Sequence, residues 1–151
     1  VSPTKTGMDQ IDILFSANKG VKPQALKQVA SGGEFSRLIF AIKYIMADKM
    51  ALPTLIFDEI DTGVSGEVAH KMGDIMKKMS KQMQVFAITH LPQIAAKGNQ
   101  HYKVFKSVQG ETTVSELKLL NTDERIVEIA EMLSGKDISD SALNHAKALL
   151  N

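Results

Sequence analysis

The sequence has 151 residues, the length of one ordinary domain, and its 44% hydrophobic and 23% charged residues can form a folded core. Its 18 basic and 17 acidic residues leave a net charge of +1, which gives no bulk signature of nucleic-acid binding. The absence of cysteine excludes a disulfide scaffold, a thiolate zinc site and a cysteine nucleophile, and no apolar run approaches the ~18 residues of a membrane span.

The first predicted elements are a short strand and a long helix. We expect residues 1–8 to form a flexible lead-in and residues 9–151 to form one domain. Ile11, Ile13 and Phe15 alternate with Asp12 and Leu14, which predicts a short strand. Glycine and proline in 18–30 predict a loop. Helical spacing of apolar residues predicts a helix over 34–49. Its apolar stripe consists of Phe35, Leu38, Ile39, Ile42, Ile45 and Met46.

A strand–helix–strand unit is predicted next. Residues 54–57 form a continuous apolar run, which is typical of a parallel strand buried on both faces. A turn over 63–66 leads to a helix over 67–81, whose methionines we interpret as core packing and not as a binding groove. A second buried strand is predicted over 85–89, and His90 follows it. With a right-handed crossover, both strands should end at the same edge of the sheet.

The remaining elements are a hairpin and two helices. Residues 102–107 and 112–117 flank Gly110 and predict a β-hairpin. Two helix starts are predicted, the first with a capping box of Asn121 and Glu124 and the second with Ser139 or Asp140 as the cap. The whole pattern predicts an α/β fold with a mostly parallel sheet, flanking helices and a β-hairpin.

Two adjacent carboxylates follow the first buried strand. Asp58 and Glu59 lie where open α/β sheets usually bind their ligands. An Asp at this place can hold Mg²⁺, and the adjacent Glu can polarise a water that attacks a phosphate. Taken alone, the dipeptide is better explained as the polar start of a loop.

A glycine-rich segment opens the long helix. Ser31, Gly32, Gly33 and Glu34 place a hydroxyl and several backbone N–H groups at a helix N-terminus, where the dipole favours an anion such as phosphate. His90, at the end of the second buried strand, can reach a phosphate or the attacking water. Each feature alone is ordinary, because capping serines and strand-end histidines are common.

The order of these features is more specific than any one of them. A glycine-rich helix start, a strand ending in Asp-Glu, a turn and a strand ending in His follow one another as in the second half of an ABC-type ATPase head. From about Met8 onward, the sequence resembles the SMC-like ATPases that repair double-strand breaks in bacterial DNA. The segments that carry this resemblance are Leu14–Gly20, Val29–Arg37, Phe57–Gly66, Thr89–Ala95 and Glu131–Gly135. The sequence departs from the family at Ala30, Phe35 and Phe40, which replace a leucine and smaller aliphatic residues.

The resemblance implies a role for each candidate residue. Asp58 would help to hold Mg²⁺, Glu59 would activate water on the ATP of its own head, and His90 would sense or stabilise the γ-phosphate. The segment Ser31–Glu34 would be the signature motif, which contacts the ATP of a second head in trans. Asp61 would lie in the D-loop near the seam between the two heads. ATP would join the heads and hydrolysis would release them.

A phosphate-binding loop of the form Gly-x-x-x-x-Gly-Lys-Ser/Thr is missing from the sequence. The nearest match, 130–137, lacks the first glycine and the hydroxyl and follows no strand, so we interpret Gly135 as a helix stop. In the family this loop lies in an N-terminal lobe of the same protein. We therefore expect a C-terminal lobe that is close to inactive alone, and the valine at position 1 suits a piece of a longer chain.

The resemblance also implies cofactors, partners and a location. The cofactors would be ATP and Mg²⁺. The partners would be the N-terminal lobe, a second head and, for the full-length protein, DNA, but no membrane. The expected location is the bacterial cytoplasm, at the nucleoid.

Two other classes of function stay open. The chain can be a head lobe of another SMC-like or ABC-type ATPase, although Glu34 favours the SMC side because transporters carry Gln there. It can also be a non-enzymatic module that binds DNA or protein. The interspersed charges and the carboxylate of Glu59 argue against that second class.

Overall fold

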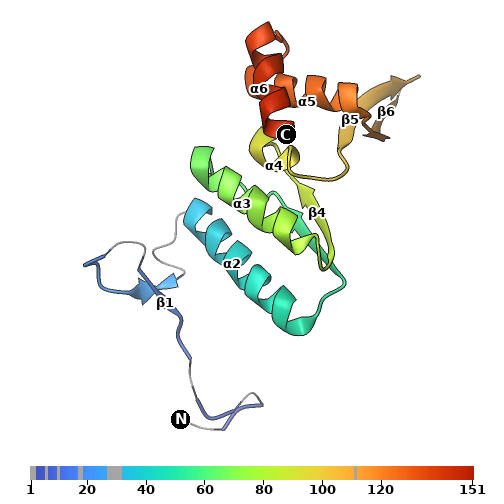
Figure 1. Cartoon of the computed structure of the whole chain (residues 1–151). Coiled ribbons are helices and arrows are strands. Elements are labelled where there is room, and N and C mark those ends of the chain that lie inside the picture. Colours follow the sequence, from blue (N-terminus) through green and yellow to red (C-terminus); the bar gives the residue numbers. More distant parts are fainter. Residues whose placement is uncertain (1–2, 6, 10, 17–18, 27–31, 111) are drawn as a thin grey trace.

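The computed structural model describes residues 3–5, 7–9, 11–16, 19–26, 32–110 and 112–151. Its elements, in chain order, are β1 (Leu14–Phe15), β2 (Gln24–Ala25), α2 (Gly32–Met50), β3 (Thr54–Asp58), α3 (Gly66–Met79), β4 (Gln84–Ile88), α4 (Pro92–Ala95), β5 (Tyr102–Gln109), β6 (Thr112–Leu119), α5 (Thr122–Ser134) and α6 (Asp140–Leu150). Figure 1 shows one group built from α2, α3 and the β3–β4 pair and another built from α5, α6 and the hairpin, with α4 between them.

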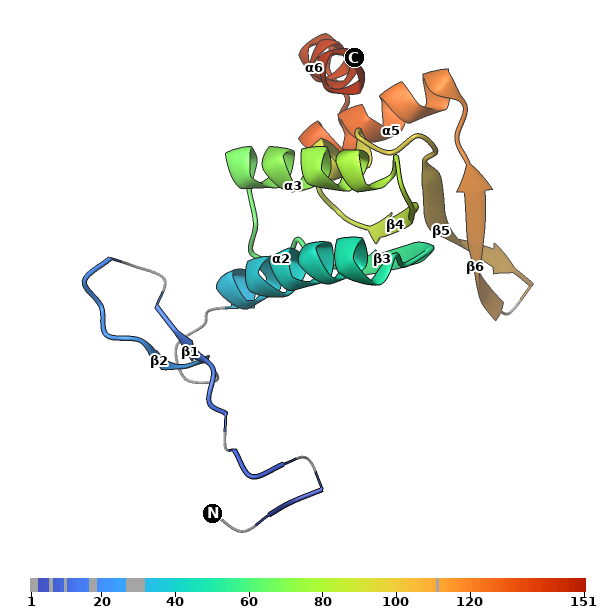
Figure 2. The ribbon, with the colours of Figure 1, turned by 60° about the horizontal axis from the view of Figure 1, so that its bottom comes forward.

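The central unit is a parallel strand–helix–strand motif, as predicted. β3 and β4 pair in parallel, and Asp58 at the end of β3 lies opposite Ile88 at the end of β4. α3 connects the two strands and runs beside α2 in both views (Figures 1 and 2). The ring of Phe40 from α2 packs on the ring of Phe57 from β3, with 5.1 Å between the centroids. The buried methionines of α3, as predicted, belong to this core: Met72, Met76 and Met79.

The outer face of the β3–β4 pair is uncovered in the part of the chain that the structure describes. Ile56, Phe86 and Ile88 are 55%, 47% and 57% exposed. Phe57, on the opposite face, is fully buried. The prediction that these strands are buried on both faces is therefore wrong for this chain, because its helices cover only the face that carries Phe57.

The predicted apolar stripe of α2 is not the face that packs in the core. Phe40 and Ala47 are buried, and both lie outside that stripe. The exposed members of the stripe are Phe35 at 45%, Ile42 at 40%, Ile45 at 59% and Met46 at 48%. α2 is thus apolar on two sides, and the described residues cover only one of them.

The C-terminal group has its own core. α5 packs against α6 and buries Ile129 and Ala130, together with Ala142 and Ala146 from α6. The predicted capping box is confirmed, because the Asn121 side chain accepts from the Glu124 N–H while the Glu124 side chain accepts from the Asn121 N–H. The predicted end of α5 and the predicted start of α6 are also confirmed. Gly135 ends α5 with φ 79°, and Ser139 caps α6.

Helix α4, which sequence reasoning missed, joins the two groups. It packs closely on α3, since a Cβ at Gly73 would stand 3.1 Å from the carbonyl oxygen of Gln93. The Arg125 guanidinium from α5 donates to the carbonyl oxygens of Ala96, at 2.8 Å, and of Gly98 at the end of α4. This arginine therefore fastens α4 to the C-terminal group.

The remaining strands form two antiparallel pairs. The hairpin β5–β6 is confirmed and is longer than predicted, with Tyr102 opposite Leu119 at its base. The N-terminal strand is shorter than predicted, and β2, which pairs with β1, falls within the segment that was expected to be a loop. None of the helices in the described ranges is both long and apolar enough to span a bilayer.

Candidate functional site

The parallel pairing brings the acidic pair and His90 to one edge of the sheet. Asp58 ends β3, and its partner in the ladder, Ile88, lies two residues before His90. Asp58, Glu59 and His90 are all exposed and so are open to a ligand. The predicted shared edge is confirmed, while the catalytic and metal-binding roles of these residues stay predictions.

Glu59 has a strained backbone. Its φ of 45° lies in the left-handed region, which costs a residue with a side chain about 1–3 kcal/mol. The conformation is held from both sides, because the Glu59 N–H donates to the Ile88 carbonyl at 3.1 Å. The Glu59 carbonyl in turn accepts from the Thr62 N–H at 3.2 Å and the Thr62 hydroxyl at 2.9 Å. Strain of this kind collects at sites where function fixes the direction of a side chain.

Asp61 is the buried charge of this edge. Its side chain is fully buried, and Oδ2 accepts a hydrogen bond from the hydroxyl of Thr89. Its other oxygen, Oδ1, is buried without a hydrogen-bond partner among the described residues and lies 3.8 Å from Nδ1 of His90. Asp61 thus faces the histidine of its own chain, whereas the resemblance placed it near a seam between heads, and that expectation stays a prediction.

Thr89 is a site residue that sequence reasoning missed. Its hydroxyl donates to Asp61, and its oxygen accepts from the Leu91 N–H at 3.0 Å. Thr89 therefore contacts both the buried carboxyl group and the backbone directly after His90. The available signal was the polar residue directly before His90 at the end of an apolar strand. That signal is not enough, because the role of Thr89 depends on its hydrogen bond to Asp61, which the sequence does not reveal.

The predicted signature segment begins α2. Ser31 lies outside the described residues, so its predicted contact with phosphate has no structural description here. Gly32 starts the helix, and a Cβ added there would meet none of the described residues within 4 Å. A Cβ at Gly33 would stand 2.9 Å from the carbonyl oxygen of Gly63, in the loop after Asp61. Glu34 is half-buried in the first turn of α2. The glycine-rich segment and the predicted D-loop are therefore in direct backbone contact.

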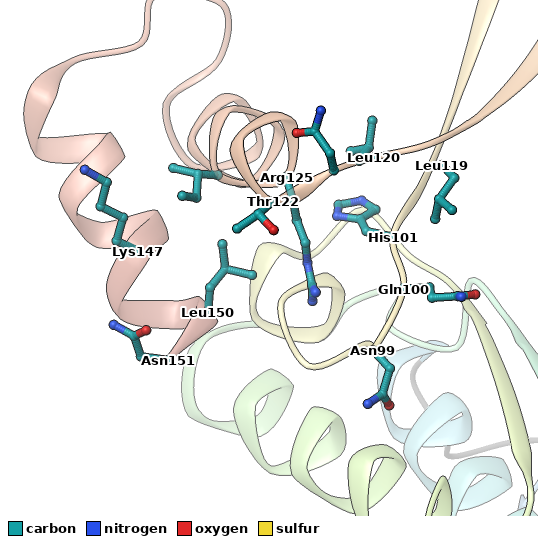
Figure 3. A pocket seen from close by; sticks show the side chains of 12 residues that line it. Asn99, Gln100, His101, Leu119, Leu120, Thr122, Arg125, Lys147, Leu150 and Asn151 are labelled. Carbon is teal, nitrogen blue, oxygen red and sulfur yellow. The ribbon is translucent and has the colours of Figure 1, made fainter.

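A separate pocket of about 480 Å³ lies between the hairpin, α5 and α6, away from this edge (Figure 3). Arg125, His101 and Lys147 are among its lining residues, and no predicted site residue lines it. Burial, with the charge of Arg125 as a second cause, holds the pKa of His101 below its ordinary value, so its imidazole is neutral. Arg125 is already engaged with the end of α4, which gives this region a structural role.

The side chains at this sheet edge can bind Mg²⁺ only if phosphate oxygens and water supply the remaining ligands. Among the described residues, no group of three or more His, Asp or Glu side chains is placed to hold a metal ion. Mg²⁺ commonly binds through one or two carboxylates and completes its shell with phosphate oxygens and water. The exposed carboxylate of Asp58 fits that pattern if a nucleotide supplies the phosphate.

Proteins named DNA repair protein RecN match this chain along its length. The one from Rickettsia typhi is 46% identical over 151 residues, and the one from Bacillus subtilis is 41% identical over 150 residues. The chain matches the C-terminal part of RecN. The alignments cover 100% and 99% of this chain but only 27% and 26% of those relatives, so the chain spans about a quarter of their length. No family model matches it.

Solved SMC head domains share the fold. The SMC head with a coiled coil and joint from Pyrococcus yayanosii gives a TM-score of 0.61 at 20% identity, covering 75% of this chain and 21% of that one. A structure from a study of ATP-driven dimerization and DNA stimulated activation of SMC ATPases gives 0.57 at 18% identity, covering 76% and 68%. At these identities the likeness shows the fold alone. The fold is that of SMC ATPase heads, and the predicted α/β class is confirmed.

Proposed function

We propose that this chain is the C-terminal half of the ATPase head of a RecN-like protein that acts in recombinational repair of double-strand breaks. The observation that carries the proposal is the edge at which the strained Glu59, Asp58 and His90 meet on a parallel strand pair. The contact between Gly33 and Gly63 supports it further, because it joins the signature segment to the same edge. The 46% and 41% identity to two RecN proteins supports a RecN-like head over another ABC-type head.

Each side chain at the edge has a chemical task in this proposal. Asp58 helps to hold Mg²⁺, which supplies charge neutralisation at the phosphates when it is bound. Glu59 orients and polarises the attacking water of its own head. His90 contacts the γ-phosphate of that same nucleotide. Together they act by positioning and charge and form no covalent bond with the substrate.

The first partner is the N-terminal lobe of the same protein, which supplies the phosphate-binding loop that this sequence lacks. The apolar outer face of β3–β4, with Ile56 and Phe86 about half exposed, supports such a lobe, because single chains rarely leave a sheet face of this kind in water. The hairpin adds a second apolar surface, where Val104 and Leu117 lie opposite each other and are 69% and 66% exposed.

The second partner is another head, joined through ATP. In this proposal the segment 31–34 of one head contacts the nucleotide held by the other, and Asp61 lies close to the junction. A Cβ at Gly32 would meet none of the described residues within 4 Å, which supports a role of Gly32 toward a ligand outside this chain. Hydrolysis then separates the heads, and the full-length protein works on DNA at the bacterial nucleoid.

A mixing experiment with the full-length protein tests this proposal. Glu59→Gln removes the base for a head's own ATP, and Gly32→Ala obstructs the signature segment that serves the other head. Each variant alone should lose ATP hydrolysis by about 10²-fold or more. Mixed in equal amounts they should regain about a quarter of the wild-type rate, because half of randomly paired heads are mixed and each of those has one intact site. No recovery on mixing would contradict the trans arrangement, and full activity of Glu59→Gln would contradict the proposed base.

A further inference from the structure

The buried carboxylate of Asp61 has one oxygen with a partner and one without. Oδ2 accepts from the Thr89 hydroxyl, whereas Oδ1 is buried and receives no hydrogen bond from the part of the chain that the structure describes. A buried acceptor without a donor is costly, and such groups in folded proteins usually have a functional explanation. The polar hydrogen-bonding group that faces Oδ1 is Nδ1 of His90, at 3.8 Å.

That distance is longer than a hydrogen bond and short enough to close by a small movement of the imidazole. The His90 side chain is 66% exposed, so its ring can move and is open to a ligand on the side away from Asp61. The carboxylate is fully buried and is held by Thr89, so it stays in place. Hydrogen bonds of this kind often tighten only when the ligand is bound.

Thr89 holds both ends of this arrangement. Its hydroxyl donates to Asp61, and its oxygen accepts from the N–H of Leu91, the N-cap residue of α4. The backbone on both sides of His90 is thereby tied to one buried carboxylate. α4 is itself fastened to α5 by Arg125, so the segment that carries His90 is anchored at both ends.

We propose that Asp61 is a positioning residue for His90: its buried Oδ1 accepts the Nδ1 proton of the imidazole, and Thr89 keeps that carboxylate in place. The hydrogen bond at one ring nitrogen sets which nitrogen carries the proton in a neutral histidine. Nδ1 therefore holds the proton, and Nε2 is the nitrogen left to face a bound anion. This last step rests on the proposed function, since the anion is then the γ-phosphate.

The proton position can be measured without nucleotide. The full-length protein is labelled with ¹³C and ¹⁵N only in histidine, and the ring shifts are recorded in buffer alkaline enough to keep imidazoles neutral. A His90→Gln variant identifies the His90 signals. The proposal predicts that His90 carries its proton on Nδ1. A proton on Nε2 in the wild-type protein would overturn it, whatever the variants do.

Asp61→Asn should reverse the proton position. The asparagine carbonyl can still accept from Thr89, which turns the amide NH₂ toward His90, and a donor there favours a bare Nδ1 and a proton on Nε2. An unchanged proton position in a folded Asp61→Asn protein would also overturn the proposal. Because this readout needs no ATP, it separates the positioning role from the proposed ATPase function.

A second pair of variants covers the case in which Asp61→Asn does not fold. Thr89→Val keeps the shape of the side chain and removes the hydroxyl, while Thr89→Ser keeps the hydroxyl. In the full-length protein Thr89→Val should lower kcat about tenfold or more with little change in the KM for ATP, and Thr89→Ser should restore most of the rate. Equal rates for the valine and serine variants would contradict the role of the hydroxyl.

Discussion

The α5–α6 pair and the β3–β4 pair differ in how completely their apolar surfaces are covered. α5 and α6 bury residues such as Ile129 and Ala146 against each other. β3 and β4 bury Phe57 on one face and leave Ile56 and Phe86 about half exposed on the other. The candidate catalytic and metal-binding residues follow the strands that are half covered. In the proposed function, the α5–α6 pair is structural support, whereas another lobe completes the β3–β4 pair.

The largest loss of stability is expected on the buried face of β3, in contrast to its exposed face. Phe57→Ala should destabilise the chain by about 3–5 kcal/mol, because it opens a cavity at a fully buried ring. Ile56→Ala, next to it on the exposed face, should change stability by less than about 0.5 kcal/mol. Urea unfolding of both variants measures the difference. Equal losses would mean that the outer face is already covered in the chain itself.

Arg125 tests the connection between the two groups. Arg125→Leu should cost about 1.5–3 kcal/mol, because the carbonyls at the end of α4 lose a charged donor. Lys147→Leu is the matched control, since it removes the same charge from an exposed position in the same pocket. Thermal unfolding of the two variants gives the comparison. If the control loses as much stability as Arg125→Leu, charge alone explains the effect and the connection through α4 is wrong.

The two glycines that begin α2 should respond differently. Gly33→Ala should destabilise by about 1–3 kcal/mol, because its Cβ would press on the backbone of Gly63. Gly32→Ala should leave stability unchanged or slightly higher, since no described residue lies within 4 Å of the added Cβ. Denaturant unfolding measures both. A strong loss in Gly32→Ala would show that this residue serves the fold and would weaken its proposed role toward a second head.

A smaller effect is expected at the start of α5. Asn121→Ala should cost about 1 kcal/mol, because the capping bond to the Glu124 N–H is lost. Exposed Asp123, in the first turn of α5, offers a control, and Asp123→Asn should have little effect on unfolding. Similar losses in both variants would contradict a special contribution of the capping bond.

The pH dependence of the same cap should be the smallest effect. A hydrogen bond from Lys118, with the Asn121 N–H as the second cause, lowers the pKa of Glu124. A lowered pKa in the folded state adds stability above the unfolded pKa, and this contribution disappears as the pH falls through the folded pKa. Unfolding of the wild type and of Glu124→Gln should therefore differ near neutral pH and converge in acid. A difference that grows in acid would contradict this sign.

The regular elements could be predicted because their signals are local. The spacing of Met72, Met76 and Met79, the Asn121–Glu124 pair and the turn at Gly110 each specify structure within a few residues. The parallel edge that joins Asp58 to His90 also followed from the strand–helix–strand order, since that order fixes the direction of the second strand.

The misses depend on contacts that a single sequence does not contain. The apolar stripe of α2 was predicted from periodicity, which reports an apolar face but not which of two faces packs in the core. Likewise, Asp61 and Thr89 are 28 residues apart, and only the fold brings them together. The strain at Glu59 and the approach of Gly33 to Gly63 are also long-range consequences of the loop after β3.

The most direct test of the half-covered site is ATP hydrolysis by this chain alone and after co-expression with the N-terminal lobe of its full-length protein. The account predicts no hydrolysis by the chain alone, hydrolysis by the pair, and its loss in the pair that carries Glu59→Gln. Hydrolysis by the chain alone that depends on Glu59 would contradict the account, because a complete phosphate site would then exist within these 151 residues.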